Sequence, residues 1–189
     1  MAKRTQGARS RKASGRRSRG ERGTSAVPSR LWAPWRMEFI AQGKVEGCIF
    51  CRYPAEGEQA DRKNLLVHRG EGAFTILNRY PYNSGHVMVV PFAHVARLEA
   101  LTREDFLRLH EELLLAAKVV RGVYRPDGMN VGMNLGHIAG AGIADHLHYH
   151  VVPRWAGDTN FMPVLFDTRV MVEHLDAAFE RLRKGFEEA

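Results

Sequence analysis

The chain has 189 residues, of which 44% are hydrophobic, so it is long enough for one well-buried domain and too short for two large ones. Its 28 Lys and Arg residues outnumber its 21 Asp and Glu residues, but ten of the basic residues and only one acidic residue lie within residues 1–30. The remainder carries 18 basic and 20 acidic residues, so the body is nearly neutral. Its charge therefore does not indicate a nucleic-acid-binding domain.

The first 30 residues are rich in Arg, Ser and Gly and nearly lack large apolar side chains. They cannot bury enough surface to offset the entropy lost on ordering. We therefore expect residues 1–30 to be a disordered basic tail and residues 31–189 to form the domain. The sequence contains neither the run of about 18 apolar residues that a membrane span needs nor the apolar segment of a secretory signal. A cytoplasmic protein without membrane association is expected.

The first half of the domain is expected to form a helix and then a meander of strands. A short helix is predicted over residues 34–40, and a polar loop over residues 53–63. Stretches rich in Val, Ile, Leu and Phe, separated by turn residues, predict three antiparallel strands over residues 65–68, 74–77 and 86–90.

The second half should contribute two helices and two more strands. Thr102, with Asp105 three residues on, matches a variant of the capping box and begins the clearest helix, which ends after Tyr124. Strands are predicted over residues 129–134 and 146–152, with a final amphipathic helix that includes Val172, Leu175, Phe179, Leu182 and Phe186. The expected class is α+β, with about five antiparallel strands, one long central helix and a C-terminal helix.

Three histidines alternate with apolar residues just after a glycine-rich stretch: His146, His148 and His150. On a strand, alternate side chains share a face, so the three imidazoles should lie together. Imidazole is the commonest metal ligand and can also act as nucleophile, general acid or general base near neutral pH. Two other interpretations stay open, which are chance alternation on a half-exposed strand and a metal site made by all three rings.

The two cysteines of the chain, Cys48 and Cys51, have the C-x2-C spacing of a metal half-site. Tetrahedral zinc would need two further nitrogen or sulfur ligands from elsewhere in the fold. The alternative is a reduced, metal-free thiol pair, because the same spacing also occurs in redox-active sites.

The run His-x-His-x-His, followed by two apolar residues, resembles the signature of the histidine triad (HIT) superfamily of nucleotide hydrolases and transferases. Upstream, residues 74–81 and 85–95 resemble that superfamily's other half-site in order and spacing, so the resemblance covers about residues 45–160. Bacterial proteins that include diadenosine tetraphosphate phosphorylases are the most similar subgroup, through residues 31–36, 130–136 and 151–155. The resemblance implies a HIT-like fold and, as is usual in the superfamily, a homodimer.

The resemblance assigns the middle histidine, His148, as the nucleophile that attacks the α-phosphorus of a nucleotide. A nucleotidyl-histidine intermediate suits imidazole, which is a competent nucleophile at neutral pH. The resemblance further implies that His150 supports the phosphate and that Asn78 contacts the ribose. Phe74 and Ile76 are expected to flank the base.

Phosphate oxygens should be bound by Asn134 and by main-chain N–H groups of the glycine-rich loop, which contains Gly136, Gly140 and Gly142. Glycine lets the backbone approach an anion closely, although a plain flexible connection would have the same composition. The superfamily often has Gln or Ser four positions before the first triad histidine, where this chain has Gly142. The loss of that donor leaves open whether water or phosphate is the acceptor.

In zinc-containing relatives, the two remaining ligands are the histidine of a Pro-x-x-His segment and the first triad histidine. In this chain these are His94 and His146. The resemblance therefore implies a closed, structural zinc site made by Cys48, Cys51, His94 and His146.

The resemblance implies a nucleotidyl transferase that cleaves dinucleoside polyphosphates, with phosphorolysis of diadenosine tetraphosphate to ADP and ATP as the leading reaction. The alternative within the same class is a hydrolase of such compounds or of nucleotidyl adducts. An alternative of another class is a nucleotide- or nucleic-acid-binding protein that acts through its basic tail, whose attraction to polyanions would be weak and non-specific. Turnover retained after removal of residues 1–30 would argue against that alternative.

Overall fold

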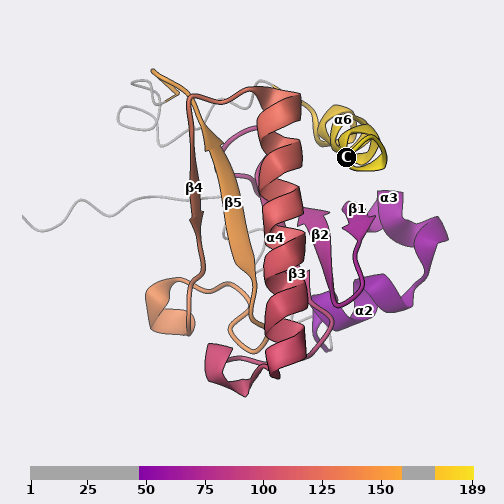
Figure 1. Cartoon of the computed structure of the whole chain (residues 1–189), viewed down its shortest axis with the longest axis vertical. Helices are drawn as coiled ribbons and strands as arrows, with labels where there is room; N and C mark the ends of the chain where they lie inside the picture. The colour runs from indigo at the N-terminus through magenta and orange to yellow at the C-terminus, as the bar shows by residue number, and fades with distance from the viewer. Residues whose placement is uncertain (1–46, 159–172) are drawn as a thin grey trace, which may run out of the picture. The chain divides into compact units, whose positions relative to one another are not determined.

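The computed structural model describes residues 47–158 and 173–189, which contain one five-stranded antiparallel sheet (Figure 1). The strand order is β1-β2-β3-β5-β4. The strands are β1 (Leu66–Arg69), β2 (Ala73–Leu77), β3 (Val87–Pro91), β4 (Gly128–Gly132) and β5 (Tyr149–Arg154). The predicted fold class is confirmed, whereas the predicted tail, the helix over residues 34–40 and Val172 lie outside the described residues.

Helices cover both faces of the sheet. The α-helices are α2 (Ile49–Ala55), α3 (Asp61–Asn64), α4 (Arg103–Tyr124) and α6 (Leu175–Glu187), and three short 3-10 helices are η1 (Glu58–Ala60), η2 (Leu98–Ala100) and η3 (His137–Ala139). Figure 1 shows α4 across one face, where it packs against β2, β3 and β5. Among the described residues, no helix is both long and apolar enough to cross a membrane.

Neighbouring residues of β2 show which helix lies on which face. Thr75 donates a hydrogen bond to Glu112 of α4, whereas the ring of Phe74 lies 6.5 Å from that of Phe50 in α2. Because adjacent side chains on a strand point to opposite faces, α2 lies on the face opposite α4. The sheet therefore has an α4 face and an α2 face.

The long helix begins as predicted, and its buried face includes a carboxylate that the hydrophobic spacing does not indicate. The hydroxyl of Thr102 accepts a hydrogen bond from the backbone N–H of Asp105, at 3.0 Å, so the cap is confirmed. Leu109 and Val120, which lie at helical spacing in the sequence, are fully buried, whereas Phe106 on the same spacing is 42% exposed and Glu112 is buried at 4% exposure. The burial of Glu112 could not be predicted from the spacing of hydrophobic residues in α4, because Glu112 carries a carboxylate.

Residues 53–63 were predicted to form a polar loop, and this prediction is wrong. The segment contains the end of α2, then η1 and most of α3. Its polar side chains are satisfied within the protein, since buried Asp61 accepts two hydrogen bonds from Arg69, and Asn64 donates to Glu56. The segment is therefore helical even though Glu58, Gln59, Arg62 and Lys63 are exposed, because its buried polar groups are hydrogen-bonded within the protein.

The triad strand begins later than predicted. Strand β5 starts at Tyr149, so of the three histidines only His150 lies within it. The backbone N–H of Leu147 donates instead to the carbonyl of Val95, at 2.7 Å, in the segment that follows β3. This bond diverts the chain from the sheet, and it brings the residues around His146 to the segment that contains His94.

The buried carboxylate of Glu112 yields a prediction about stability. His68 lies 2.9 Å from one carboxylate oxygen and 3.0 Å from the other, and Thr75 donates to the same group. The change Glu112→Ala removes the partner of buried Thr75 and of half-buried His68 and should lower the free energy of unfolding by about 2–4 kcal/mol. Denaturant unfolding measures the change. Glu111→Ala, on the exposed side of the same helix, should cost less than about 0.5 kcal/mol, and equal losses would contradict this account.

Candidate active site and metal cluster

Four ligand atoms from distant parts of the chain converge next to the triad. They belong to Cys48, Cys51, His94 and His146, and all lie within 4.8 Å of one another. Cys48 precedes the first residue of α2, and Cys51 lies one turn further along. The Nδ1 atom of His146 lies 3.3 Å from Cys48 Sγ, 3.6 Å from Cys51 Sγ and 3.2 Å from His94 Nδ1. These four residues, called the metal cluster below, could hold one metal ion.

The distances from His146 Nδ1 to the other three ligand atoms are close to those of tetrahedral zinc. With Zn–S bonds of about 2.3 Å and Zn–N bonds of about 2.0–2.1 Å, neighbouring ligand atoms are separated by about 3.3–3.8 Å. The Nε2–H of His146 donates to the carbonyl of Pro91 at 2.8 Å, which leaves the lone pair on Nδ1 facing the other ligands. Burial and the adjacent Cys48 raise the pKa of Cys51, because two close thiolates repel. A divalent cation would relieve that repulsion.

The middle histidine has its proton fixed by the backbone. His148 is 5% exposed, and its Nδ1 lies 2.9 Å from the carbonyl oxygen of His146. A carbonyl only accepts, so Nδ1 carries the proton and the lone pair is on Nε2. Burial lowers the pKa of His148 and so favours the neutral ring. The arrangement supplies an uncharged imidazole with a free Nε2 lone pair, which nucleophilic attack requires.

A second buried histidine fixes the opposite tautomer in the third triad residue. The backbone N–H of Tyr82 donates to Nδ1 of His86 at 3.0 Å, so neutral His86 carries its proton on Nε2. That Nε2 lies 3.0 Å from Nδ1 of His150 and donates to it. Burial, and then repulsion by His148, lower the pKa of His150 to about 4. Neutral His150 therefore carries its proton on Nε2, as a hydrogen-bond donor.

Sequence reasoning placed His86 in a strand and gave it no role in the site. The structure buries it completely, at 0% exposure, between Asn78, Tyr82 and His150. A signal was available, because a histidine directly before the apolar run Val87–Val90 is expected to be buried and to need polar partners. What the sequence could not show was which partners the register of β3 and β5 would supply.

The residues predicted to contact the nucleoside, Asn78, Phe74 and Ile76, lie in two different surroundings. Asn78 is half-buried, its Oδ1 accepts from the N–H of Tyr80, and its Nδ2 lies 3.4 Å from the ring nitrogens of His86. Phe74 and Ile76 are buried in the apolar core, at 0% and 3% exposure. Contact of these two side chains with a base stays a prediction, and it would require the side chains that cover them to move.

Asn134 and the predicted glycines lie in the connection between β4 and the triad. Gly136 and Gly140 have φ angles of +85° and +94°, which favour glycine over residues with a side chain. The loop therefore needs these two glycines for its own conformation, whether or not it binds phosphate. A Cβ atom at Gly142 would meet no atom within 4 Å, so the space beside that residue is open.

Residues 59–157 match the HIT domain family. The chain belongs to the HIT family. It is 41% identical over 155 residues to the AP-4-A phosphorylase of Mycobacterium tuberculosis H37Rv, covering 77% of this chain and 78% of that protein. It is 31% identical over 93 residues to the bis(5'-adenosyl)-triphosphatase of Dictyostelium discoideum, covering 49% of this chain and 62% of that one.

Solved HIT structures have the same fold. A hypothetical histidine triad nucleotide-binding protein from Sulfolobus tokodaii has a TM-score of 0.60 and 26% identity, covering 75% of this chain and 93% of that one. A zinc-bound histidine triad family protein from Mycobacterium smegmatis has a TM-score of 0.59 and 24% identity, covering 75% and 94%. The HIT fold and the HIT-family resemblance drawn from the triad are confirmed.

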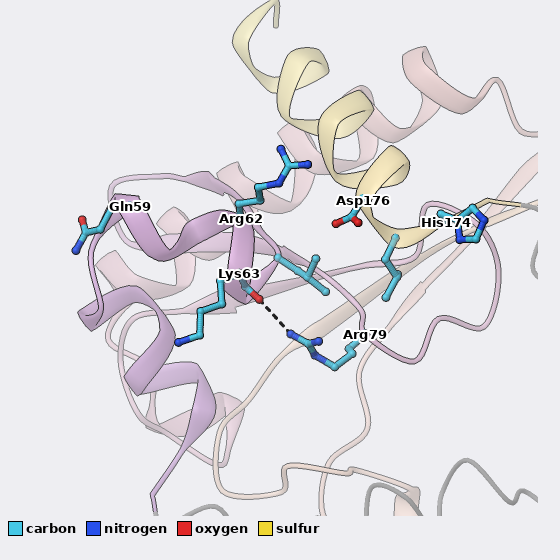
Figure 2. Close-up of a pocket in the computed structure, with 8 residues that line it drawn as sticks. Gln59, Arg62, Lys63, Arg79, His174 and Asp176 are labelled. Carbon is cyan, nitrogen blue, oxygen red and sulfur yellow. Dashed lines mark hydrogen bonds between the residues drawn. The ribbon is translucent and has the colours of Figure 1, made fainter.

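The structure also contains a cavity of about 700 Å³ that none of the triad or metal-cluster residues line (Figure 2). It lies between α3, the end of β2 and the start of α6, and its lining is rich in cationic side chains. These cations have partners, since Arg62 pairs with Glu180, Lys63 pairs with Glu56, and Arg79 donates to the carbonyl of Lys63. Because no triad or metal-cluster residue lines the cavity, it does not belong to the candidate active site.

We predict that the metal cluster binds one metal ion tightly in each chain. The Cys48→Ser variant should contain no metal ion and should have a lower melting temperature, because the cluster joins α2 to the segments that follow β3 and precede β5. His174→Ala, at an exposed histidine outside the cluster, should keep the ion. Elemental analysis of the purified proteins, with thermal unfolding in the presence of a chelator, measures both effects. Wild-type protein that lacks metal and is unaffected by chelator would contradict the prediction.

Proposed function

We propose that this HIT-family enzyme cleaves dinucleoside polyphosphates by transferring a nucleotidyl group to His148. Its proposed reaction is phosphorolysis of diadenosine tetraphosphate to ADP and ATP. The observation that carries the proposal is the buried His148 ring, whose Nδ1 donates to the His146 carbonyl and whose Nε2 is left as a nucleophile. The 41% identity to an AP-4-A phosphorylase over most of both chains supports the choice of substrate.

The proposed reaction has two displacement steps at the same phosphorus atom. In the first, Nε2 of His148 attacks the α-phosphorus, the bond from phosphorus to the bridging oxygen breaks, and ATP leaves. In the second, an oxygen of inorganic phosphate attacks the adenylyl-histidine, the P–N bond breaks, and ADP is released. The Nε2–H of His150 is the proposed donor to a phosphate oxygen, where it stabilises developing negative charge. Asn134 and the N–H groups of the Gly136–Gly142 loop are the proposed further donors.

Phosphate as the acceptor is supported by the glycine at position 142. A Cβ atom at Gly142 would meet no atom within 4 Å, so no described side chain closes off this part of the loop from an incoming acceptor. Hydrolysis is the competing reaction, and the bis(5'-adenosyl)-triphosphatase relative keeps it as the second candidate. The ribose contact of Asn78 belongs to the same proposal, and a weak contact of the basic tail with nucleic acid stays a prediction.

We propose zinc as the ion of the metal cluster, with a structural role. Two thiolates and two imidazoles are a usual ligand set for zinc, and four protein ligands leave no position for substrate. The ion would therefore hold α2, His94 and His146 together. The two transfer steps need no metal-bound group.

A homodimer is proposed from two exposed apolar side chains on the α4 face. Strand β4 is an edge of the sheet, where Val131 is 48% exposed and lies opposite Val151. Leu114 of α4 is 73% exposed. Within residues 47–158 and 173–189, β4 leaves one edge of the sheet unpaired, and both an unpaired edge and exposed apolar side chains favour association with a second copy.

The dimer is tested by adding charge at this surface. A variant with both Val131→Glu and Leu114→Glu should sediment as a monomer, whereas the wild type and Ile138→Glu should sediment as dimers. Ile138 is fully exposed at the tip of the glycine-rich loop, which makes it a matched control. Sedimentation velocity over a range of concentrations measures the association. A wild-type protein that stays monomeric at high concentration would disprove the proposal.

The reaction is tested by product analysis with and without phosphate. Wild-type enzyme given diadenosine tetraphosphate should form ADP and ATP only when phosphate is added. His148→Ala should lower kcat by about 10³-fold or more, as expected for loss of a covalent nucleophile, and His150→Ala by about 10²-fold. His174→Ala should behave as wild type. Two ADP, or AMP plus ATP, formed without phosphate would replace phosphorolysis by hydrolysis, and near-normal turnover by His148→Ala would refute both.

A further inference from the structure

Phe50 links the metal cluster to the nucleophile. It lies in α2 between Cys48 and Cys51, and its side chain is buried at 1% exposure. The centre of its ring lies 5.5 Å from that of His146 and 5.0 Å from that of His148. The ring that separates the two cysteines in sequence therefore contacts a metal-cluster histidine and the proposed nucleophile together.

The hydrogen bond at Nδ1 cannot by itself orient the ring of His148. It fixes which nitrogen carries the proton, but the ring can still tilt about the bond to the His146 carbonyl. Two side chains restrict that tilt, since Phe50 packs at an interplanar angle of 57° and His150 packs at 73° with its ring centre 5.0 Å away. In-line attack tolerates little misalignment, and a displacement of about 1 Å can cost 10²-fold in rate. The aromatic contact is therefore placed to control the direction of Nε2.

We infer that Phe50 is a positioning residue for His148, an inference that rests on the proposed nucleotidyl transfer. Its ring holds the imidazole plane so that the Nε2 lone pair points into the site. Cys48 and Cys51 anchor both sides of Phe50 on the first turn of α2. Residues that bind the metal thus also set the position of the side chain that orients the nucleophile.

The test compares the same substitution at two buried phenylalanines. Phe50→Leu keeps an apolar side chain in α2 and removes the aromatic contact. Phe179→Leu is the matched control. Phe179 belongs to the same apolar core at 5% exposure, and its ring packs against Arg62. Both variants are assayed at equal zinc content, set by dialysis and checked by elemental analysis. The measurements are kcat, KM and the ring ¹⁵N spectrum of His148.

Phe50→Leu should lower kcat by about tenfold or more with KM within about twofold, because orientation affects the chemical step more than binding. The His148 ring should keep its Nδ1–H tautomer, because the bond to the His146 carbonyl remains, but its ring resonances should shift and broaden as the imidazole plane is no longer restricted, while Phe179→Leu keeps wild-type kcat and spectrum. An unchanged His148 spectrum, an unchanged kcat, or a rise in KM alone would overturn the inference. His148→Ala, measured in parallel, separates the two failures, because normal turnover by that variant would refute the proposed function itself.

Discussion

The hydrogen bond from Nδ1 of His148 to the carbonyl of His146 is the interaction on which the site depends. It ties the proton position of one histidine to the backbone of another, and that second histidine is fixed in turn by its own ring. Nε2 of His146 donates to Pro91, and its Nδ1 faces the thiols of the metal cluster. A single residue therefore belongs to the metal cluster through its side chain and to the candidate active site through its main chain. Displacement of His146 would disturb both.

The site also depends on histidine rings that are buried and uncharged. His86 and His146 are fully buried and His148 nearly so, and each has a backbone carbonyl or N–H group as a partner. An unpaired buried ring nitrogen would cost roughly 1–3 kcal/mol, so these bonds are needed for the fold as well as for chemistry. Burial also lowers the pKa of His148 and of His150, which favours the neutral forms. Neutral rings in fixed tautomers provide one acceptor and one donor without rearrangement.

Sequence periodicity predicted most of the fold, because it reports which side chains face the core. The strands, the Thr102 cap of α4 and the C-terminal helix all follow from alternation, spacing and capping chemistry. The predicted alternation of side chains in the triad segment is also seen in the structure, where successive side chains point to opposite faces of the sheet. Tyr149 contacts His110 of α4 at 3.1 Å, whereas His148 contacts Phe50 on the α2 face. Alternation, helical spacing and capping could be predicted from the sequence because they depend on residues that are close together in the chain.

Other features depended on contacts between distant residues, and no local pattern contains them. The burial of Glu112 follows from His68 and Thr75 on two strands. The role of His86 follows from the register of β3 with β5, which sets Met88 opposite His150. The start of β5 at Tyr149 follows from the bond between Leu147 and Val95. Each is decided by the tertiary partner, which the sequence does not identify.

The central claim is that His148 becomes covalently bound to the nucleotide during turnover. Mass spectrometry of the enzyme, quenched without acid after incubation with diadenosine tetraphosphate in the absence of phosphate, tests it most directly. The account predicts an adenylyl group on the peptide that contains His148, and none in His148→Asn. An adduct on another residue, or turnover with no adduct in rapidly quenched samples, would contradict the account.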